Sequence, residues 1–307
     1  MRLIFPAFLT IFLSIHGLTH VEQATAQDHG LSDTDEPSVL VVTAHPDDEA
    51  MFAATIYRIT HDLDGAVDLA LVTDGAGGFH YSSLANSFYG MELTDPNIAR
   101  QYLPAIRKKE LMAGGNIIGI RNYFFLDQPD LGKTEDQDSI LTYVWDTEFV
   151  GERLDHILER GKYDYVFTHL PIKPFHSHHK AATILALQAV QRMAPGDRPV
   201  ILGSFTTGGM DSIVEAFEQL EGHPETRVRK DVGPYTFDRS TKFGYRNRLD
   251  YNIVVNWLIA EHKSQGTMQL YMRNKGIERF WVYAIDGTDA PARAEKLLNM
   301  VQNGGIE

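Results

Sequence analysis

Cysteine does not occur in this chain of 307 residues. The chain therefore forms no disulfide, offers no thiolate ligand to a metal and carries no lipid on a cysteine. Long basic runs are also missing, and the formal net charge is −13. An acidic balance of this size argues against nucleic acid or an anionic membrane surface as the main partner. It leaves the choice of a small-molecule or glycan substrate open.

The first 26 residues have the pattern of a signal peptide. Arg2 gives a positive start, residues 3–15 form an apolar run, and Ala24-Thr25-Ala26 is a small-residue cleavage site. The apolar run is short for a membrane span and Pro6 interrupts it, so we favour a cleaved signal over an uncleaved anchor. We therefore expect a secreted or periplasmic protein without a stable membrane span after cleavage.

Beyond a polar leader at residues 27–37, short apolar runs alternate with segments of helical periodicity. The run at 39–42 is short and rich in valine, as in a buried strand, and residues 49–62 have apolar side chains at a helical period. Strands that alternate with helices favour a parallel sheet covered by helices on both faces. We therefore predict one α/β domain over residues 38–307, with three layers and a mostly parallel sheet.

The strand at 39–42 ends in a turn that carries three ionisable side chains, His45, Asp47 and Asp48. In open α/β sheets the ligand crevice lies at the carboxyl ends of the strands. Imidazole and carboxylate are ligands that zinc accepts at catalytic sites. At such short range these groups would repel one another or change their protonation states unless a cation bound between them. The turn is therefore interpreted as half of a metal site.

A second cluster, four histidines within eleven residues, follows the strand predicted at 163–169. Its members lie between the carboxyl end of that strand and the first turn of a helix predicted at 180–193. Two of them, His176 and His179, are three residues apart, which puts both on one face of a helical turn. A single histidine is more often structural than a ligand. Four at the matching sheet edge favour metal ligation.

Two features outside these turns are candidates for substrate contacts. The segment 79–96 holds several aromatic residues without clear periodicity, so it either stacks against a sugar ring or forms an insertion packed by its own aromatics. Arg107 lies on the next predicted helix and suits contact with an oxygen-rich part of a substrate. Its alternative is an exposed i,i+3 pair with Glu110.

With both histidine motifs placed, the chain resembles the PIG-L, or LmbE-like, family of zinc-dependent N-acetylglucosaminyl deacetylases over most of residues 38–285. The family has a Rossmann-like sheet, which matches the alternation of strands and helices. The motifs that carry the resemblance are Ala44-His45-Pro46-Asp47-Asp48-Glu49 and Thr168-His169 followed by His176-x-x-His179, with support from Thr73-Asp74-Gly75, Arg107-x-x-Glu110 and His262-x-Ser264-Gln265.

The resemblance implies that His45, Asp48 and His179 bind zinc or another divalent metal. It also implies that Asp47 is the general base and that His176 is the polarising or acid histidine. Asp47 has an alternative role as the cap of the helix that follows it.

One departure from the family pattern concerns the second motif. The family commonly has His-Pro-Asp-His where this chain has His176-Ser177-His178-His179, so His178 replaces the aspartate that often partners the first histidine. This replacement bears on the orientation of His176 and on the pH at which it works. We expect the remaining contacts with the substrate to come from Arg107 and Asp74.

We therefore expect an exported hydrolase that removes an acetyl group from an N-acetylglucosamine-type amino sugar, in a small molecule or a glycan. Amide hydrolysis at neutral pH needs activated water, which zinc with three protein ligands supplies. Two alternatives remain: a hydrolase of another amide, because nothing in the site itself reads the sugar, and a catalytically weak glycan-binding protein, which His178 favours. The sequence predicts no oligomeric state.

Overall fold

The computed structural model describes residues 36–206, 211–273, 276–285 and 287–303, which belong to one compact unit. The predicted signal peptide at 1–26 and most of the leader at 27–37 lie outside the described residues. None of the described helices is both long and apolar enough to cross a membrane.

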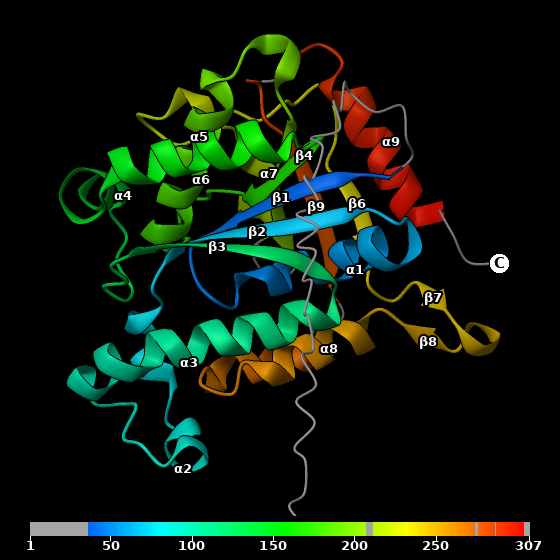
Figure 1. Ribbon diagram of the computed structural model, residues 1–307. Helices are drawn as coiled ribbons and strands as arrows, with labels where there is room; N and C mark the ends of the chain where they lie inside the picture. The colour runs from blue at the N-terminus through cyan, green and yellow to red at the C-terminus, as the bar shows by residue number, and fades with distance from the viewer. Residues whose placement is uncertain (1–35, 207–210, 274–275, 286, 304–307) are drawn as a thin grey trace, which may run out of the picture. The chain divides into compact units, whose positions relative to one another are not determined.

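A seven-stranded sheet forms the centre of this unit, in the order β3-β2-β1-β4-β5-β9-β6 (Figure 1). The five strands from β3 to β5 are parallel, whereas β9 runs antiparallel to both of its neighbours. A short hairpin, β7 and β8, lies apart from the sheet. The strands are β1 (Ser38–Thr43), β2 (Ala66–Thr73), β3 (Ile120–Gln128), β4 (Tyr165–His169), β5 (Val200–Thr206), β6 (Tyr235–Asp238), β7 (Lys242–Phe243), β8 (Leu249–Asp250) and β9 (Ile277–Val282).

Helices cover both faces of the sheet, and each face has its own apolar core. Side chains of a strand point alternately to the two faces. Accordingly, Val39 and Val41 of β1 belong to one core, and Leu40 and Val42 to the other. The first core is closed by α1 (Ala53–Asp62), α3 (Pro96–Ile117), α8 (Asn252–Glu261) and α9 (Ala290–Asn303), the second by α5 (Thr147–Gly161), α6 (Ser177–Arg192) and α7 (Asp211–Ala216).

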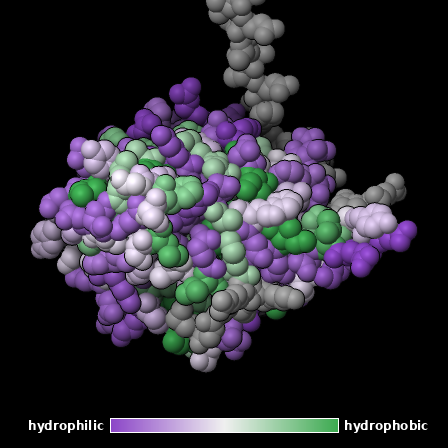
Figure 2. Space-filling model, turned by 90° about the horizontal axis from the view of Figure 1, so that it is seen from below, coloured by the Kyte–Doolittle hydropathy of each residue, from purple (hydrophilic) through white to green (hydrophobic). Residues whose placement is uncertain are grey.

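Figure 1 shows α5 and α6 on one side of the sheet and α3 and α8 on the other. Seen from the side of α3 and α8, the surface is mostly polar with separate apolar patches (Figure 2). The mostly parallel sheet between two helical layers confirms the predicted three-layer α/β class.

Several boundaries differ from the sequence prediction by a few residues, and three regions differ in the kind of element. The helix predicted from residue 49 begins as a 3-10 helix, η1 (Asp48–Met51), because the Asp48 carboxylate bonds back to the turn before it and tightens the first turn. The glycine-containing segment after the strand predicted at 66–73 suggests a loop, but a 3-10 helix, η2 (Ala76–Tyr81), begins there. The polar region 215–250, for which the sequence predicts no element, contains β6, β7 and β8. The remaining short elements are α2 (Ala85–Tyr89), α4 (Gln137–Ser139), η3 (Ile140–Val144), η4 (Pro195–Asp197), η5 (Pro224–Thr226), η6 (Tyr245–Asn247) and η7 (Gly266–Arg273).

The strand order reverses between β1 and β4. From β1 the chain builds the sheet outward through β2 and β3, and from β4 it builds the other way through β5. Ligand sites of open α/β sheets lie at such a reversal, beyond the carboxyl ends of the strands. Both predicted motifs follow these two strands, and the parallel register of β1 and β4 brings the motifs to the same edge.

Candidate functional site

The turn after β1 is held in place by Asp48. Its Oδ2 accepts hydrogen bonds from the backbone N–H groups of Ala44 (3.0 Å) and His45 (2.7 Å). The end of β2 supports the same turn, because the amide and hydroxyl of Thr73 both donate to the Ala44 carbonyl. Bonds to two backbone amides fix the Asp48 carboxylate, so its second oxygen, Oδ1, keeps a defined direction toward His179.

His45, Asp48 and His179 come together at this edge, as the sequence predicted. The Nδ1 atom of His45 lies 3.0 Å from Nε2 of His179, and Oδ1 of Asp48 lies 3.1 Å from the same Nε2. Two imidazole nitrogens and one carboxylate oxygen are a donor set that divalent metals accept at catalytic sites. The three residues fit a metal ion and can hold one.

The histidines buried around Asp48 favour the charged form of its carboxylate. Burial raises the pKa of Asp48, but His179 and the neighbouring His169 outweigh that effect and hold the pKa of this carboxyl well below its usual range. His169 lies at the end of β4 with its ring stacked on His179 (4.5 Å between centroids). Burial lowers the pKa of His169 to about 3, so this fully buried ring is neutral.

His176 occupies the start of α6. Its Nδ1 accepts a hydrogen bond from the backbone N–H of His178 (3.2 Å), which caps the helix. The neutral ring therefore carries its hydrogen on Nε2. Burial, followed by the charge of His45, lowers the pKa of His176 to about 4. This histidine is consequently a neutral hydrogen-bond donor at neutral pH, which suits the polarising role rather than the acid role among the two that the resemblance implies.

His178 lies beside His176, with 4.6 Å between the ring centroids. Its ring is buried and stacks on Trp145, with 5.4 Å between centroids. Its Nδ1 lies 3.2 Å from Nε2 of His45 and 3.5 Å from Oδ1 of Asp130. Although His178 replaces the aspartate that is common in the family, the carboxylate of Asp130, from another part of the chain, lies beside it.

Asp130 is a site residue that the sequence did not reveal, because it lies in the segment 127–138, whose polar composition predicts a loop. Only 3% of Asp130 is exposed. Its Oδ1 lies 4.0 Å from Nε2 of His45, and its Oδ2 lies 3.9 Å from Nη1 of Arg107. Burial raises the pKa of Asp130, but the charges of His45 and Arg107 bring it below the usual value. The one sequence signal is its place two residues after β3, at the same edge of the sheet.

Arg107 reaches the site from α3 and is buried. Its Nη2 lies 3.0 Å from Oδ1 of Asp47, and its Nη1 donates to the carbonyl of Gly75 (2.7 Å). The alternative of an exposed pair with Glu110 is wrong, because Glu110 is also buried and accepts from the amide and hydroxyl of Ser264.

Asp47 lines the cavity beside the metal-competent group. It stands at the start of η1, yet its side chain makes no capping hydrogen bond in the described structure. The alternative role of Asp47 as a helix cap is therefore wrong. Its carboxylate is oriented instead by the Arg107 guanidinium.

Asp74 lies one layer behind the cavity. Its Oδ1 accepts from the backbone N–H groups of Ala76 (2.9 Å) and Asp130 (3.2 Å). The described residues that line the cavity do not include Asp74. By accepting from the backbone of Asp130, Asp74 positions that residue. A direct contact of Asp74 with a substrate stays a prediction.

The site opens into a cavity of about 610 Å³. That volume lies within the roughly 300–1,000 Å³ typical of small-molecule sites. The segment 79–96 contributes to it in part: His80 and Tyr81 line the cavity, whereas Phe79 and Tyr89 pack into a small core of their own. The polar residues that line it are His45, Asp47, Asp48, His80, Arg107, Asp130, Lys133, His176, His179, Thr206, Arg239, Gln265 and Thr267.

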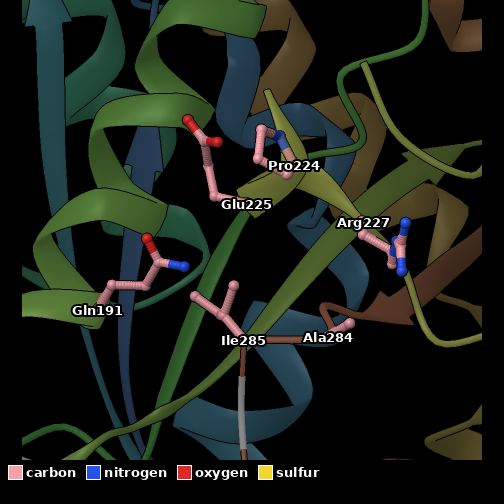
Figure 3. Close-up of a pocket in the computed structure, with 6 residues that line it drawn as sticks. All are labelled: Gln191, Pro224, Glu225, Arg227, Ala284 and Ile285. Carbon is pink, nitrogen blue, oxygen red and sulfur yellow. The ribbon is translucent and has the colours of Figure 1, made fainter. Parts of the chain in front are cut away.

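A second pocket, of about 470 Å³, lies away from the histidines at the end of α6 (Figure 3). Its one carboxylate, that of Glu225, accepts a hydrogen bond from Gln188 (3.3 Å). Without a histidine or a nucleophile in its lining, this pocket offers no comparable chemistry. It is lined by Gln191, Pro224, Glu225, Arg227, Ala284 and Ile285.

The family model described as "PIG-L: GlcNAc-PI de-N-acetylase" matches residues 40–190, a stretch that contains both histidine motifs. The chain belongs to the PIG-L family. The family recognised from the two motifs is thereby confirmed.

Two relatives and one solved structure are similar to this PIG-L protein. The probable N-acetyl-alpha-D-glucosaminyl L-malate deacetylase 2 of Bacillus cereus is 26% identical over 249 residues, which cover 81% of this chain and 98% of the relative. The protein of the same name from Bacillus subtilis is 27% identical over 162 residues, which cover 52% of this chain and 64% of the relative. A crystal structure of a deacetylase in the biosynthesis pathway of teicoplanin has a TM-score of 0.52 at 16% identity, covering 81% of this chain and 100% of that one, and shows likeness of fold.

Proposed function

We propose that this protein is an exported, zinc-dependent hydrolase that removes the acetyl group from an N-acetylglucosamine-type amino sugar. The observation that carries the proposal is the convergence of His45, Asp48 and His179 beside the Asp47 carboxylate, in a cavity large enough for a sugar. The description of the family model and the names of the Bacillus relatives support the same substrate class.

His45, Asp48 and His179 would hold the metal. Two imidazole nitrogens and a carboxylate are also the protein ligands of several zinc hydrolases, which is why zinc is the proposed ion. When bound at such a site, zinc supplies Lewis-acid activation of water and of the scissile carbonyl.

Asp47 acts as the general base in this mechanism. The Arg107 guanidinium engages Oδ1 of Asp47, which fixes the carboxylate toward the cavity. The other oxygen, Oδ2, takes a proton from the attacking water and returns it to the amine that leaves as the C–N bond breaks. A positioned general base is worth about 10²–10⁴ in rate.

His176 stabilises the oxygen of the acetyl carbonyl. Because its Nδ1 accepts from the backbone, Nε2–H is the group that remains to donate into the cavity. Such a donor stabilises the negative charge that develops on this oxygen in the transition state, and it does so without transferring its proton.

The alternative of a catalytically weak glycan-binding protein depended on His178. Asp130 now offers a buried carboxylate to His178 and to His45, so the site keeps an acidic partner for its histidines. We therefore propose turnover and place glycan binding without hydrolysis as an outcome of the test.

Acetate release from N-acetylglucosamine and its conjugates tests the proposal directly. The purified protein should release acetate, lose the activity when a chelator removes its metal, and recover it when zinc is added. Release of a different acid from other amides would support the alternative hydrolase. Tight glycan binding with no acetate release would support the non-catalytic alternative.

Export is tested separately by intact mass analysis of the protein from its native host. Cleavage after Ala26 would give a mature chain that begins near Gln27. A mature mass that retains residues 1–26 would contradict the signal peptide.

A further inference from the structure

The two ring nitrogens of His45 face two different groups of side chains. Nδ1 belongs to the metal-competent group described above, 3.0 Å from Nε2 of His179. Nε2 faces the other way, 3.2 Å from Nδ1 of His178 and 4.0 Å from Oδ1 of Asp130. Each nitrogen of this one ring therefore has donor atoms of other residues close to it.

The spacing of the atoms around Nε2 of His45 fits a metal ion. Nitrogen ligands at about 2.0–2.1 Å from a tetrahedral zinc ion lie about 3.3 Å from one another. The Nδ1 atom of His178 lies 3.2 Å from Nε2 of His45 and 3.5 Å from Oδ1 of Asp130. The corresponding separations around His179 in the first group are 3.0 and 3.1 Å. By spacing, both sides of the His45 ring suit an ion.

His176 completes this second set, and we define the second histidine group as His45, His176 and His178. One ligand nitrogen of each residue lies within 4.8 Å of those of the other two. Because Nδ1 of His176 accepts a hydrogen bond from the backbone, Nε2 is its nitrogen that remains for an ion. Three imidazoles suit zinc, copper or nickel better than magnesium or calcium.

Asp130 supplies negative charge to the second histidine group, as Asp48 does to the first group. Its Oδ1 faces His45 and His178, whereas its Oδ2 faces Arg107 at 3.9 Å. A buried cation needs such a carboxylate beside it. His45 and His176 line the cavity, and His178 is fully buried. An ion can therefore enter from the cavity, with His178 as the innermost ligand.

We propose that His45, His176 and His178 form a second zinc site beside the first one, with the His45 ring shared between the two ions. His178 is the residue that creates this site, because the family commonly has an aspartate at its position. When both nitrogens of His45 bind zinc, the proton of the ring is released to solvent, as metal binding to histidine generally requires.

A filled second site would change the role of His176. Its Nε2 would bind the ion and could no longer donate a hydrogen bond to the acetyl oxygen. This consequence rests on the proposed hydrolase function. Loss of one such donor costs about 10²–10³ in rate, so acetate release should rise with the first equivalent of zinc and fall with the second.

Zinc titration of the chelator-treated protein tests the second site directly, by calorimetry and by elemental analysis of the desalted protein. The wild type should bind two ions per chain. His178→Phe keeps a ring that can stack on Trp145 but has no ligand atom. This variant should bind the first ion and lose more than about 100-fold in affinity for the second, because changes beyond the ligands already cost 10–100-fold.

Two further variants make the titration specific. His178→Gln also lacks the imidazole and serves if the phenylalanine variant does not fold, with retained binding of the first ion as the sign of an intact site. His156→Phe is the matched control, because His156 is an exposed histidine of α5. It should bind two ions like the wild type.

The outcomes separate this inference from the function proposed above. A wild type that binds no zinc counts against the metal-dependent hydrolase itself. One ion per wild-type chain overturns the second site alone. Two ions in the wild type and in both His178 variants would show an adventitious ion only, and this also overturns the site. If the second equivalent leaves acetate release unchanged, His176 is not one of its ligands and the proposed ligand set is wrong.

Discussion

The metal-competent edge of the cavity and the apolar rim at its mouth (Tyr81, Leu84, Leu270 and Tyr271) are built in opposite ways. At the edge, hydrogen bonds and an ion pair hold the side chains: two backbone amides hold Asp48, Arg107 holds Asp47, and a backbone amide of α6 holds His176. The rim consists of half-exposed side chains from two separate short elements, η2–α2 and η7. A preorganised edge suits chemistry that tolerates little movement, and a less constrained rim suits the variable part of a substrate.

The edge is also supported by a buried polar layer that the rim does not have. Glu49 and His262 meet at 2.5 Å, with both side chains fully buried. Burial raises the pKa of Glu49, and the charge of Glu49 in turn raises the pKa of His262 against the opposing effect of burial. The predictions below test whether rigidity at the edge, and not at the rim, decides activity.

The largest effect is expected for Asp48→Ala. The change removes a metal ligand together with the acceptor of two turn amides, so bound zinc and acetate release should be lost together. Elemental analysis and an activity assay measure both, with chelator-treated wild type as the reference. Asp48→Asn is the control that keeps an oxygen for the amides. A full complement of zinc in Asp48→Ala would contradict the assigned ligand set.

The next effect is expected for Asp47→Asn. The amide keeps the shape of the side chain but cannot take a proton, so kcat should fall by about 10²–10⁴ while zinc stays bound. Because Asp47 makes no capping hydrogen bond, the melting temperature should change little. Hydrolysis at a near wild-type rate would show that another group is the base.

Asp130→Asn should have a smaller effect, about 10–100-fold in zinc affinity or kcat. Asp130 is not one of the three residues that would hold the metal. It acts by orienting His45 and His178. Zinc titration and the pH profile of kcat measure this effect, since a purely structural role would change neither. Asp136→Asn, an exposed acid in the same loop, is the matched control. Equal results for the two variants would remove Asp130 from the site.

These contrasts also explain which features the sequence predicts. His45 and Asp48 were predictable because they directly follow an apolar strand, and His179 because it lies on the first turn of the helix after β4. Parallel strands bring their carboxyl ends to one edge. Asp130 was not, because its position depends on how the loop after β3 folds back over Asp74 and Gly132.

Local geometry and charge state were the other limits of the sequence. The 3-10 helix η1 begins where the Asp48 carboxylate accepts hydrogen bonds from the backbone of the preceding turn. Helical periodicity in the sequence does not predict such bonds. The neutral state of His176 depends on burial, a property of the folded chain. The strands and helices with strong periodicity were predicted within a few residues, and the region 215–250, which lacks it, was not.

The smallest effect is expected within the segment 79–96, where two leucines separate packing from exposure. Leu93 is fully buried with Leu103 in the segment's own small core, whereas 68% of Leu84 is exposed at the rim. Leu93→Ala should lower the free energy of unfolding by about 2–5 kcal/mol, because it leaves a cavity. Leu84→Ala should change it by no more than about 0.5 kcal/mol, as for most surface positions. Urea denaturation of both variants measures the difference. If Leu84→Ala destabilises the protein as much as Leu93→Ala, then Leu84 is held by packing, and the rim would not be a surface kept free for a substrate.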